Sequence, residues 1–299
     1  MQKVLVTGGS GFVGWNLCNR LLQSGLDVYA TNNGCGNVLP ENVKKINKNY
    51  SGLNLDNYSF NCVFHTSAIN DTQSNDLKGF NEVNVKDTAY IFEKCYKNGC
   101  RKFIYSSSTA VYGHSNPPYI EDETKLDPLT FYALSKTNME FYADTFKNEK
   151  KDALVVGLRY CNVYGFGEFH KGKRASMIHQ FIINKIFNKQ TKIFKDGEQK
   201  REWVFVDDVV EANVLASNSS ESTIYNVGSG ECVSFNYLVD LIGLSNNIRY
   251  VECPFKGTFQ NFTSSSIDKI VYKLGYKPKN SLSFNVFELE KKLRSYFYV

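Results

Sequence analysis

The sequence predicts an α/β protein that combines a doubly wound parallel sheet with a smaller α/β part after it. Short β-branched runs alternate with helical patterns through residue 165, and a glycine-rich turn separates the first run from the first helical pattern. After Gly165 the alternation becomes looser. We therefore expect one domain over residues 1–165 and a smaller substrate-binding part over 166–299, with a strand or two crossing back to the first domain.

In the first part, short apolar runs predict buried strands and amphipathic stretches predict helices. The expected strands lie at 2–7, 27–31, 61–65, 102–107 and 153–160, with a weak strand near 43–47. The expected helices lie near 12–24, 79–98 and 130–149. In the second part we expect strands at 191–194, 224–227 and 248–252, helices at 174–188, 207–218 and 234–243, and two terminal helices. Open α/β sheets bind ligands at the carboxyl ends of their strands, so a cleft is expected there.

The composition argues against several classes of partner. With 35 Lys and Arg against 30 Asp and Glu, the net charge is +5, and no basic stripe predicts nucleic-acid binding. The eight cysteines contain no C-x-x-C pair and the four histidines lack metal-ligand spacing, so we expect reduced thiols and no metal site. No signal peptide or membrane-spanning apolar run stands out. We expect a cytosolic protein without nucleic-acid or membrane partners.

Three glycines follow the first expected strand. Gly8, Gly11 and Gly14 form the pattern G-x-x-G-x-x-G. The first glycine suits a tight turn, the second lets the backbone approach a pyrophosphate, and the third lets the next helix pack on the strand. The amides at the start of that helix, near Phe12, would face the phosphates. The motif predicts a dinucleotide site; the alternative is a glycine turn in a βα unit that binds no nucleotide.

Two later motifs supply acid–base groups. Tyr132 and Lys136 stand four residues apart, on one face of an expected helix. A lysine there lowers the pKa of the tyrosine and can hydrogen-bond a nicotinamide ribose, which suits proton removal from a substrate alcohol. Ser107 and Ser108 lie at the carboxyl end of an expected strand, where a hydroxyl can hold that alcohol. Alone, this Tyr–Lys spacing is common on helix surfaces, but here it follows the glycine motif and the serine run in order.

These motifs resemble the extended short-chain dehydrogenase/reductase family. The matching segments are TGGSGFVG, SSSTAVYG, YALSK, RYCNVYG and REWVFVDDVVEA. The resemblance implies a Rossmann-type sheet domain, a nucleotide-sugar substrate, and a catalytic triad of Ser108, Tyr132 and Lys136. It also implies that the cofactor contacts Gly8, Gly11, Phe12, Val13, Gly14, Thr31, Asn32, Ala68, Ile69, Asn84, Tyr132, Lys136 and Val163.

The segment after RYCNVYG resembles one particular group within this family. Its Glu168-Phe-His-Lys-Gly172 run is similar to the loop of the nucleotide-heptose 6-epimerases, which act on ADP-glycero-manno-heptose. That likeness implies a second catalytic base at Lys171. Burial next to a cationic neighbour such as Lys136 or Lys173 would lower the pKa of this lysine toward neutrality and make it a usable base. Inverting a stereocentre by transient oxidation needs proton donors on both faces of a flat ketone, which two bases supply. The alternative role for Lys171 is diphosphate binding. The implied substrate contacts are Ser108, Asn162, Lys173, Gln180, Phe194, Arg201 and Phe259.

Departures from the family pattern bear on the cofactor and the sugar. The second strand ends in Thr31-Asn32-Asn33, where the family usually carries an acidic residue for the adenosine ribose. Without that carboxylate a 2′-phosphate meets no repulsion, which favours NADP, although no arginine stands there and NAD stays possible. Thr258 replaces a usual arginine of the epimerases, which leaves the nucleotide base and the sugar open.

The sequence therefore predicts an isomerase, a nucleotide-heptose 6-epimerase that recycles tightly bound NADP in each turnover and forms a homo-oligomer. One alternative is a 4-epimerase or a 4-keto-sugar reductase on the same scaffold, which has no need of Lys171. A second, non-enzymatic alternative is a regulator that binds the cofactor to sense redox state. The complete set of Ser108, Tyr132 and Lys136 argues against the regulator, because a sensor has no use for an acid–base pair.

Overall fold

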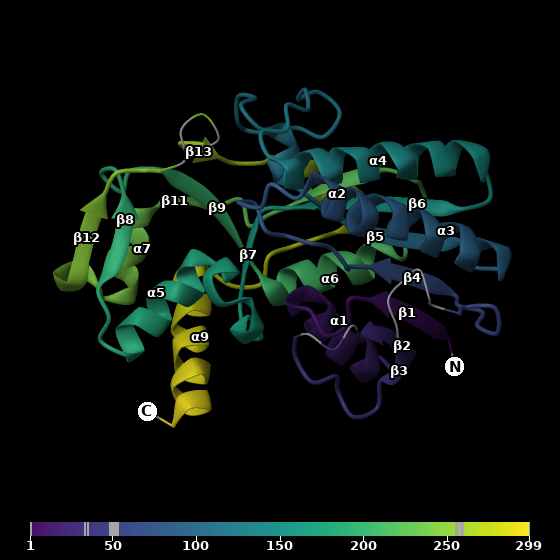
Figure 1. Cartoon of the computed structure of the whole chain (residues 1–299), viewed down its shortest axis with the longest axis horizontal. Coiled ribbons are helices and arrows are strands. Elements are labelled where there is room, and N and C mark those ends of the chain that lie inside the picture. The colour runs from purple at the N-terminus through teal and green to yellow at the C-terminus, as the bar shows by residue number, and fades with distance from the viewer. Residues whose placement is uncertain are drawn as a thin grey trace.

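A seven-stranded sheet forms the centre of the protein, and each of its neighbouring strand pairs is parallel. The computed structural model describes residues 2–32, 34, 36–47, 54–254, 257 and 260–298. The strand order is β10-β6-β5-β4-β1-β2-β3 (Figure 1). These strands are β1 (Lys3–Thr7), β2 (Asp27–Asn32), β3 (Lys44–Asn47), β4 (Cys62–His65), β5 (Lys102–Ser108), β6 (Leu154–Tyr160) and β10 (Ile224–Val227). The predicted α/β fold with a doubly wound parallel sheet is confirmed.

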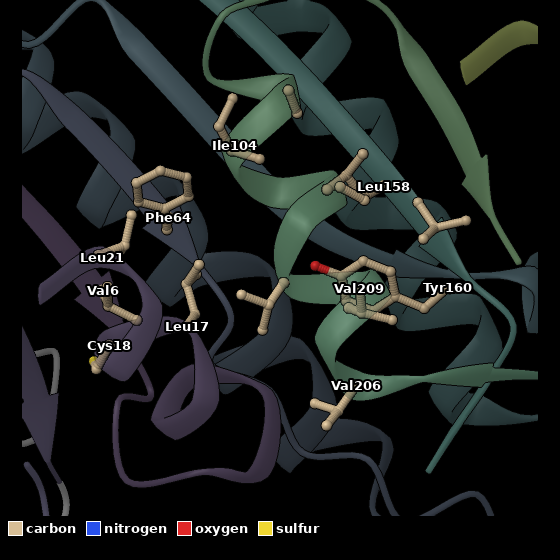
Figure 2. Packing of buried hydrophobic residues seen from close by; sticks show 14 of the residues in the cluster. Val6, Leu17, Cys18, Leu21, Phe64, Ile104, Leu158, Tyr160, Val206 and Val209 are labelled. Carbon is tan, nitrogen blue, oxygen red and sulfur yellow. The ribbon is translucent and has the colours of Figure 1, made fainter. Parts of the chain in front are cut away.

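Helices cover both faces of this sheet. On one face lie α1 (Phe12–Gln23) and α6 (Val206–Ala216), and Figure 2 shows Leu17 and Leu21 of α1 beside Phe64 of β4, with Val209 of α6 near Tyr160 of β6. On the other face lie α3 (Asp87–Lys97) and α4 (Phe131–Glu149), which bury a second apolar cluster. α3 continues from α2 (Leu77–Phe80) through a π-helical stretch, η2 (Asn81–Lys86). Burial on both faces explains why the central strands β1 and β4 are mostly apolar.

The remaining elements form a smaller part at the opposite end of the molecule from β3 (Figure 1). Its core joins α5 (Met177–Ile186), α7 (Phe235–Ile242) and α9 (Leu282–Phe297) to Trp203 of β9 (Lys200–Phe205). β9 pairs with β7 (Asn162–Tyr164), β11 (Cys232–Ser234) and β13 (Phe262–Thr263), and β8 (Thr191–Phe194) pairs with β12 (Ile248–Val251). The chain returns to the large sheet with α6 and β10, and α8 (Asp268–Leu274) packs beside them through Ile270.

Several elements of the second part differ from the sequence-based expectation. β7, β9, β11 and β13 were not expected, because they are short or, like β9, begin with charged residues. The helix expected at 174–188 begins only at Met177, since the Ser176 side chain caps it by accepting a hydrogen bond from the His179 amide. The preceding residues form a 3-10 helix, η4 (Phe169–Arg174). Among the helices that the structure describes, none has both the length and the apolar character needed to cross a bilayer.

Candidate active site

A cavity of about 430 Å³ opens at the carboxyl ends of the central strands, where the sequence argument places a cleft. Residues at or just beyond the ends of β1, β2, β4 and β5 line it, together with residues of α4, β7 and η4. The predicted site residues on its wall are Gly8, Gly11, Phe12, Val13, Gly14, Thr31, Ala68, Ser108, Tyr132, Lys136, Val163 and Lys171. One cavity thus brings together the expected cofactor-binding and catalytic groups.

The glycine turn after β1 has no room for side chains. Gly8 has a φ of +68°, and a Cβ on it would lie 2.8 Å from the Cα of Ser67. A Cβ on Gly14 would lie 2.3 Å from the carbonyl oxygen of Gly8. The N-cap Gly11 offers no side-chain oxygen to the first amides of α1, and that first turn carries no acidic residue. This cradle fits the pyrophosphate of a dinucleotide, which would bind the open amides at the start of α1.

The end of β2 carries neutral side chains on both predicted ribose contacts. The Gly8 amide donates to Thr31 Oγ1 at 2.9 Å, and the Gly34 amide donates to Asn32 Oδ1 at 2.8 Å. Thr31 lines the cavity, whereas Asn32 is not on its wall. Lys44 forms an ion pair with Asp27 at 2.8 Å, so its ammonium is engaged away from the expected 2′-phosphate site. Asn33, the last residue of this segment, lies outside the described residues.

Asn84 anchors the loop after β4 through hydrogen bonds to its backbone. Its side chain is fully buried, accepts from the Ile69 amide at 2.8 Å, and donates to the Ile69 carbonyl at 3.0 Å. It also donates to Ser135 Oγ on α4 at 2.9 Å. Asn84 and Ile69 are absent from the cavity wall, but they fix the loop that places Ala68 on it. This geometry gives them a supporting role, and their direct contact with a cofactor stays a prediction.

Ser108, Tyr132 and Lys136 meet on one wall of the cavity. Ser108 ends β5, Tyr132 lies in the first turn of α4, and Lys136 follows one turn later. The helix begins there because Thr130 caps it by accepting from the Ala133 amide at 3.1 Å. Burial raises the pKa of Tyr132, while a hydrogen bond from Ser108 lowers it. The net effect is a rise, whereas the sequence argument expected Lys136 to lower this pKa.

Lys136 points its ammonium at the backbone of β5. Its Nζ donates to the Ser106 carbonyl at 2.7 Å. Burial lowers the pKa of Lys136 to about 8, against the attraction of Glu140, which raises it. Glu140 itself accepts from Arg159 through both carboxylate oxygens, at 3.0 and 2.8 Å, and from Ser107 Oγ at 2.5 Å. This buried network ties α4 to β5 and β6 one helical turn beyond Lys136.

A neutral histidine lies close to the same lysine. His65 ends β4, and its two ring nitrogens are hydrogen-bonded to Thr7 Oγ1 at 2.8 Å and Thr88 Oγ1 at 2.9 Å. Burial lowers the pKa of His65 to about 3, and the positive charge of Lys136 contributes in the same direction. His65 therefore stays uncharged near neutral pH and links the ends of β1 and β4 to α3.

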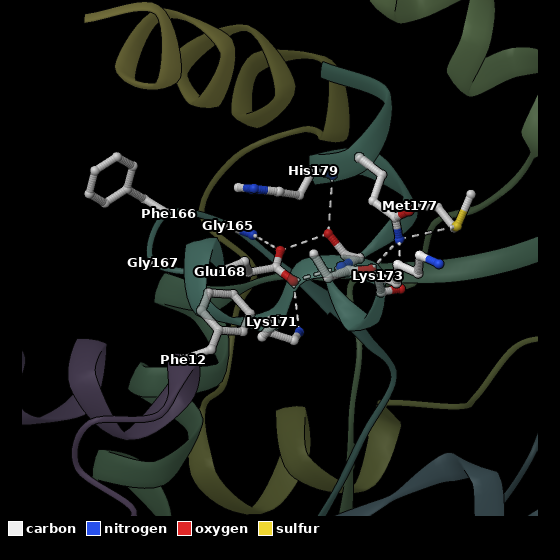
Figure 3. A network of polar contacts seen from close by, with 12 residues as sticks. Phe12, Gly165, Phe166, Gly167, Glu168, Lys171, Lys173, Met177 and His179 are labelled. Carbon is white, nitrogen blue, oxygen red and sulfur yellow. Dashed lines mark hydrogen bonds and ion pairs between the residues drawn. The ribbon is translucent and has the colours of Figure 1, made fainter. Parts of the chain in front are cut away.

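Lys171 approaches the cavity from η4, a separate element from the one that carries Tyr132. Its Nζ lies 2.7 Å from Glu168 Oε2 and 4.8 Å from the centroid of the Phe12 ring, at the first residue of α1 (Figure 3). The sequence argument expected a cationic neighbour for Lys171. The structure instead places it against a fully buried carboxylate.

Five expected substrate contacts lie away from this cavity wall. Lys173 is exposed, Asn162 donates to the Glu202 carbonyl at 2.9 Å, and Gln180 donates to the Ala175 carbonyl at 2.7 Å. Phe194 ends β8, and Arg201 on β9 donates to the Lys200 and Gln260 carbonyls. Burial lowers the pKa of Arg201 to about 10. Phe259 lies outside the described residues, so the role of all six in substrate binding stays a prediction.

Sequence reasoning missed part of the wall. The additional lining residues are Ser10, Thr66, Ser67, Asn70, Thr72, Ser106, Tyr160, Cys161, His170 and Arg174. Ser107, which the sequence argument names beside Ser108, also lies on the wall. Those between 66 and 72 directly follow the β4 strand, so the rule that parallel sheets bind ligands at the carboxyl ends of their strands could have found them. Within the described part of the chain, no group of His, Cys, Asp or Glu side chains is arranged to hold a metal ion.

A glycine cradle and a Ser–Tyr–Lys group on one cavity define the class of nicotinamide-dependent α/β enzymes. The model of the NAD dependent epimerase/dehydratase family matches residues 4–228, and the chain belongs to this family. Together with the relatives described next, this makes the protein an NAD(P)-dependent epimerase, an isomerase.

Among its relatives are two bacterial enzymes named ADP-L-glycero-D-manno-heptose-6-epimerase. The one from Brachyspira hyodysenteriae is 32% identical, with 89% of this chain and 90% of that protein covered. The one from Fusobacterium nucleatum is 30% identical, with 95% of each covered. Among solved structures, the Helicobacter pylori ADP-L-glycero-D-manno-heptose-6-epimerase has a TM-score of 0.88 at 28% identity, covering 98% of this chain and 96% of that one. The Thermotoga maritima UDP-glucose 4-epimerase, solved with UDP-glucose, has a TM-score of 0.91 at 27% identity, covering 99% and 100%.

Proposed function

We propose that this epimerase inverts C6 of a nucleotide-activated heptose, ADP-glycero-manno-heptose, by transient oxidation with two protein bases. The observation that carries the proposal is that Lys171 and Tyr132 line one cavity from different elements. Two relatives with 30 and 32% identity, both named as heptose 6-epimerases, support the choice of sugar.

In this proposal Ser108 holds the C6 hydroxyl and Tyr132 removes its proton. A nicotinamide cofactor held at the glycine cradle would supply reversible hydride transfer at C6. Lys171 then supplies the proton when the hydride returns to the other face of the C6 carbonyl. Lys136, which lies one helical turn after Tyr132 on the same cavity wall, would bind the nicotinamide ribose.

The residues around the glycine cradle fit such a cofactor. Gly8 and Gly14 allow a close approach of the backbone that a Cβ would block, and the start of α1 offers its amides to a pyrophosphate. We propose NADP as the natural cofactor, because Thr31 and Asn32 set no carboxylate against a 2′-phosphate.

The test is conversion of ADP-glycero-manno-heptose, followed by nuclear magnetic resonance of the C6 configuration. We expect the wild-type enzyme to reach an epimer mixture without net change in the reduced-nicotinamide absorbance. Lys171→Met should abolish this conversion while substrate affinity stays within about threefold. Lys192→Met is the matched control, because Lys192 is exposed on β8 and is not on the cavity wall, and it should behave as wild type.

The alternative is a 4-epimerase of nucleotide sugars, which the TM-score of 0.91 to a UDP-glucose 4-epimerase favours. Epimerisation of a UDP-hexose at C4 that survives Lys171→Met would select that alternative. Stoichiometric consumption of NADPH would select a keto-sugar reductase. If Lys171→Met loses substrate affinity but turns over bound substrate normally, Lys171 is a phosphate ligand and the two-base proposal fails.

A further inference from the structure

Glu168 is a buried carboxylate that the proposed chemistry leaves without a role. Its side chain is 0% exposed and carries four hydrogen bonds. Ser176 donates to it twice, from its amide and its hydroxyl, both at 2.7 Å, and the Gly165 amide donates at 3.3 Å. The fourth donor is Lys171 Nζ at 2.7 Å (Figure 3). A buried charge is costly unless it is paired and hydrogen-bonded, and here both conditions are met.

Three of the four donors are groups of Gly165 and Ser176, and only the fourth belongs to Lys171. Gly165 and Ser176 therefore orient the carboxylate on their own, with one oxygen, Oε2, turned to Lys171. Lys171 has a long, flexible stem and needs a partner to hold its ammonium in one place. Because the carboxylate is fixed independently of the lysine, its geometry sets the position of the Lys171 ammonium.

The segment that carries both residues is itself fastened to the sheet domain. Asn16 of α1 donates to the Phe166 carbonyl at 3.0 Å, and Asn37 donates to the Gly167 carbonyl at 2.9 Å. Gly167 has a φ of +106°, a backbone conformation that side chains disfavour. These clamps hold η4 against the start of α1, so that Lys171 lies over the Phe12 ring at 4.8 Å.

We propose that Glu168 is a positioning residue, which holds the Lys171 ammonium at the cavity wall through their ion pair. The inference rests on the proposed function, because that function makes Lys171 the second base. Glu168 touches neither substrate nor cofactor in this assignment, and it acts through Lys171 alone. This role would explain the glutamate at the start of the Glu-x-His-Lys-Gly run.

The test is Glu168→Gln in the full-length enzyme. Glutamine keeps the side-chain length and one acceptor for the Ser176 and Gly165 donors, but it removes the charge that holds Lys171. The first measurement is acetylation by a water-soluble amine-reactive ester, mapped by mass spectrometry as the labelling of Lys171 relative to the exposed Lys192. Lys171 is now 12% exposed, and we expect its relative labelling to rise several-fold in the variant.

The second measurement separates kcat from KM with the heptose substrate. A misplacement of about 1 Å can cost about 10²-fold in rate, so kcat should fall by about that factor while KM stays within about threefold. Glu290→Gln is the matched control, because Glu290 on α9 accepts from Lys185 at 2.9 Å, is not on the cavity wall, and is 16% exposed. It should leave both the labelling ratio and kcat at wild-type values.

Unchanged labelling and unchanged kcat in Glu168→Gln would overturn the inference. So would equal losses in Glu168→Gln and Glu290→Gln, because these would indicate a general effect on stability. If Glu168→Gln does not fold, Glu168→Asp replaces it: the charge stays but moves by one methylene, and both readouts must shift in the same directions. If labelling rises but the wild-type enzyme leaves the heptose unchanged, the proposed function fails and the positioning role of Glu168 stands.

Discussion

The buried ion pair between Arg159 and Glu140 gives a stability prediction that the structure specifies in detail. The two side chains are 6 and 8% exposed, and the contact is bidentate. Glu140 accepts hydrogen bonds from Arg159 and from the Ser107 hydroxyl, and Arg159→Met leaves it only the second of these. The Tyr112 hydroxyl also loses its hydrogen bond from Arg159, which is 2.7 Å long. Removing one partner of such a buried pair costs about 3–5 kcal/mol, because the remaining charge stays buried without compensation.

Urea unfolding followed by circular dichroism measures this cost. The control is Arg101→Met, because the side chains of the Arg101–Asp152 pair are 43 and 58% exposed and exposed ion pairs contribute little to stability. The double variant Arg159→Met with Glu140→Leu should recover much of the loss, since it leaves no buried charge. A loss in Arg159→Met no greater than in Arg101→Met would refute the reasoning, as would a double variant that is less stable than the single one.

Three further predictions concern the site itself. Tyr132→Phe removes the transferable proton but keeps the ring, so turnover should fall by about 10²- to 10⁴-fold in the epimerisation assay; activity near the wild-type level would exclude Tyr132 as the main acid–base group. The pKa of His65 is about 3 in the folded protein against an ordinary value of 6.5, so between these two values only the unfolded chain binds the proton. The free energy of unfolding should therefore fall as pH drops from about 6.5 to about 3, and His65→Gln should show a smaller fall than the wild type; equal slopes would contradict the assignment. Calorimetric titration should give tighter binding of NADP than of NAD, because Thr31 and Asn32 are neutral where the family usually carries the ribose carboxylate, and equal or tighter binding of NAD would exclude that preference.

The parts of the site that sequence predicts well are those fixed by local spacing. The glycine cradle needs only a strand, a turn and a helix in sequence, so Gly8 and Gly14 stand where the motif places them. Tyr132 and Lys136 share a helix face for the same reason. Their common presence on one cavity wall then follows from the rule that parallel strands present their carboxyl ends at one edge of the sheet.

Contacts between residues far apart in sequence could not be predicted in this way. The Glu140–Arg159 pair joins a helix to a strand, and no pattern in either segment indicates the other. The hydrogen bonds between the Asn84 side chain and the backbone of Ile69 also join separate segments, and the expected contact of Asn84 with the cofactor stays a prediction. The pairing of β9 with β11 and β13 at Arg201, and the hydrogen bond from its guanidinium to the Gln260 carbonyl, are further contacts of this kind. The expected contact of Arg201 with the substrate stays a prediction.

The two roles considered for Lys171 place different demands on its partner. A diphosphate ligand needs an ammonium that is free to meet the phosphate, and a fixed carboxylate beside it would repel that anion. The Glu168 carboxylate lies 2.7 Å from Lys171 Nζ and is itself held by Ser176 and Gly165. A proton donor, in contrast, needs its ammonium held in a fixed position at the substrate, and a hydrogen-bonded carboxylate can provide that position. The ion pair therefore favours the role of Lys171 as an acid–base group over that of a phosphate ligand.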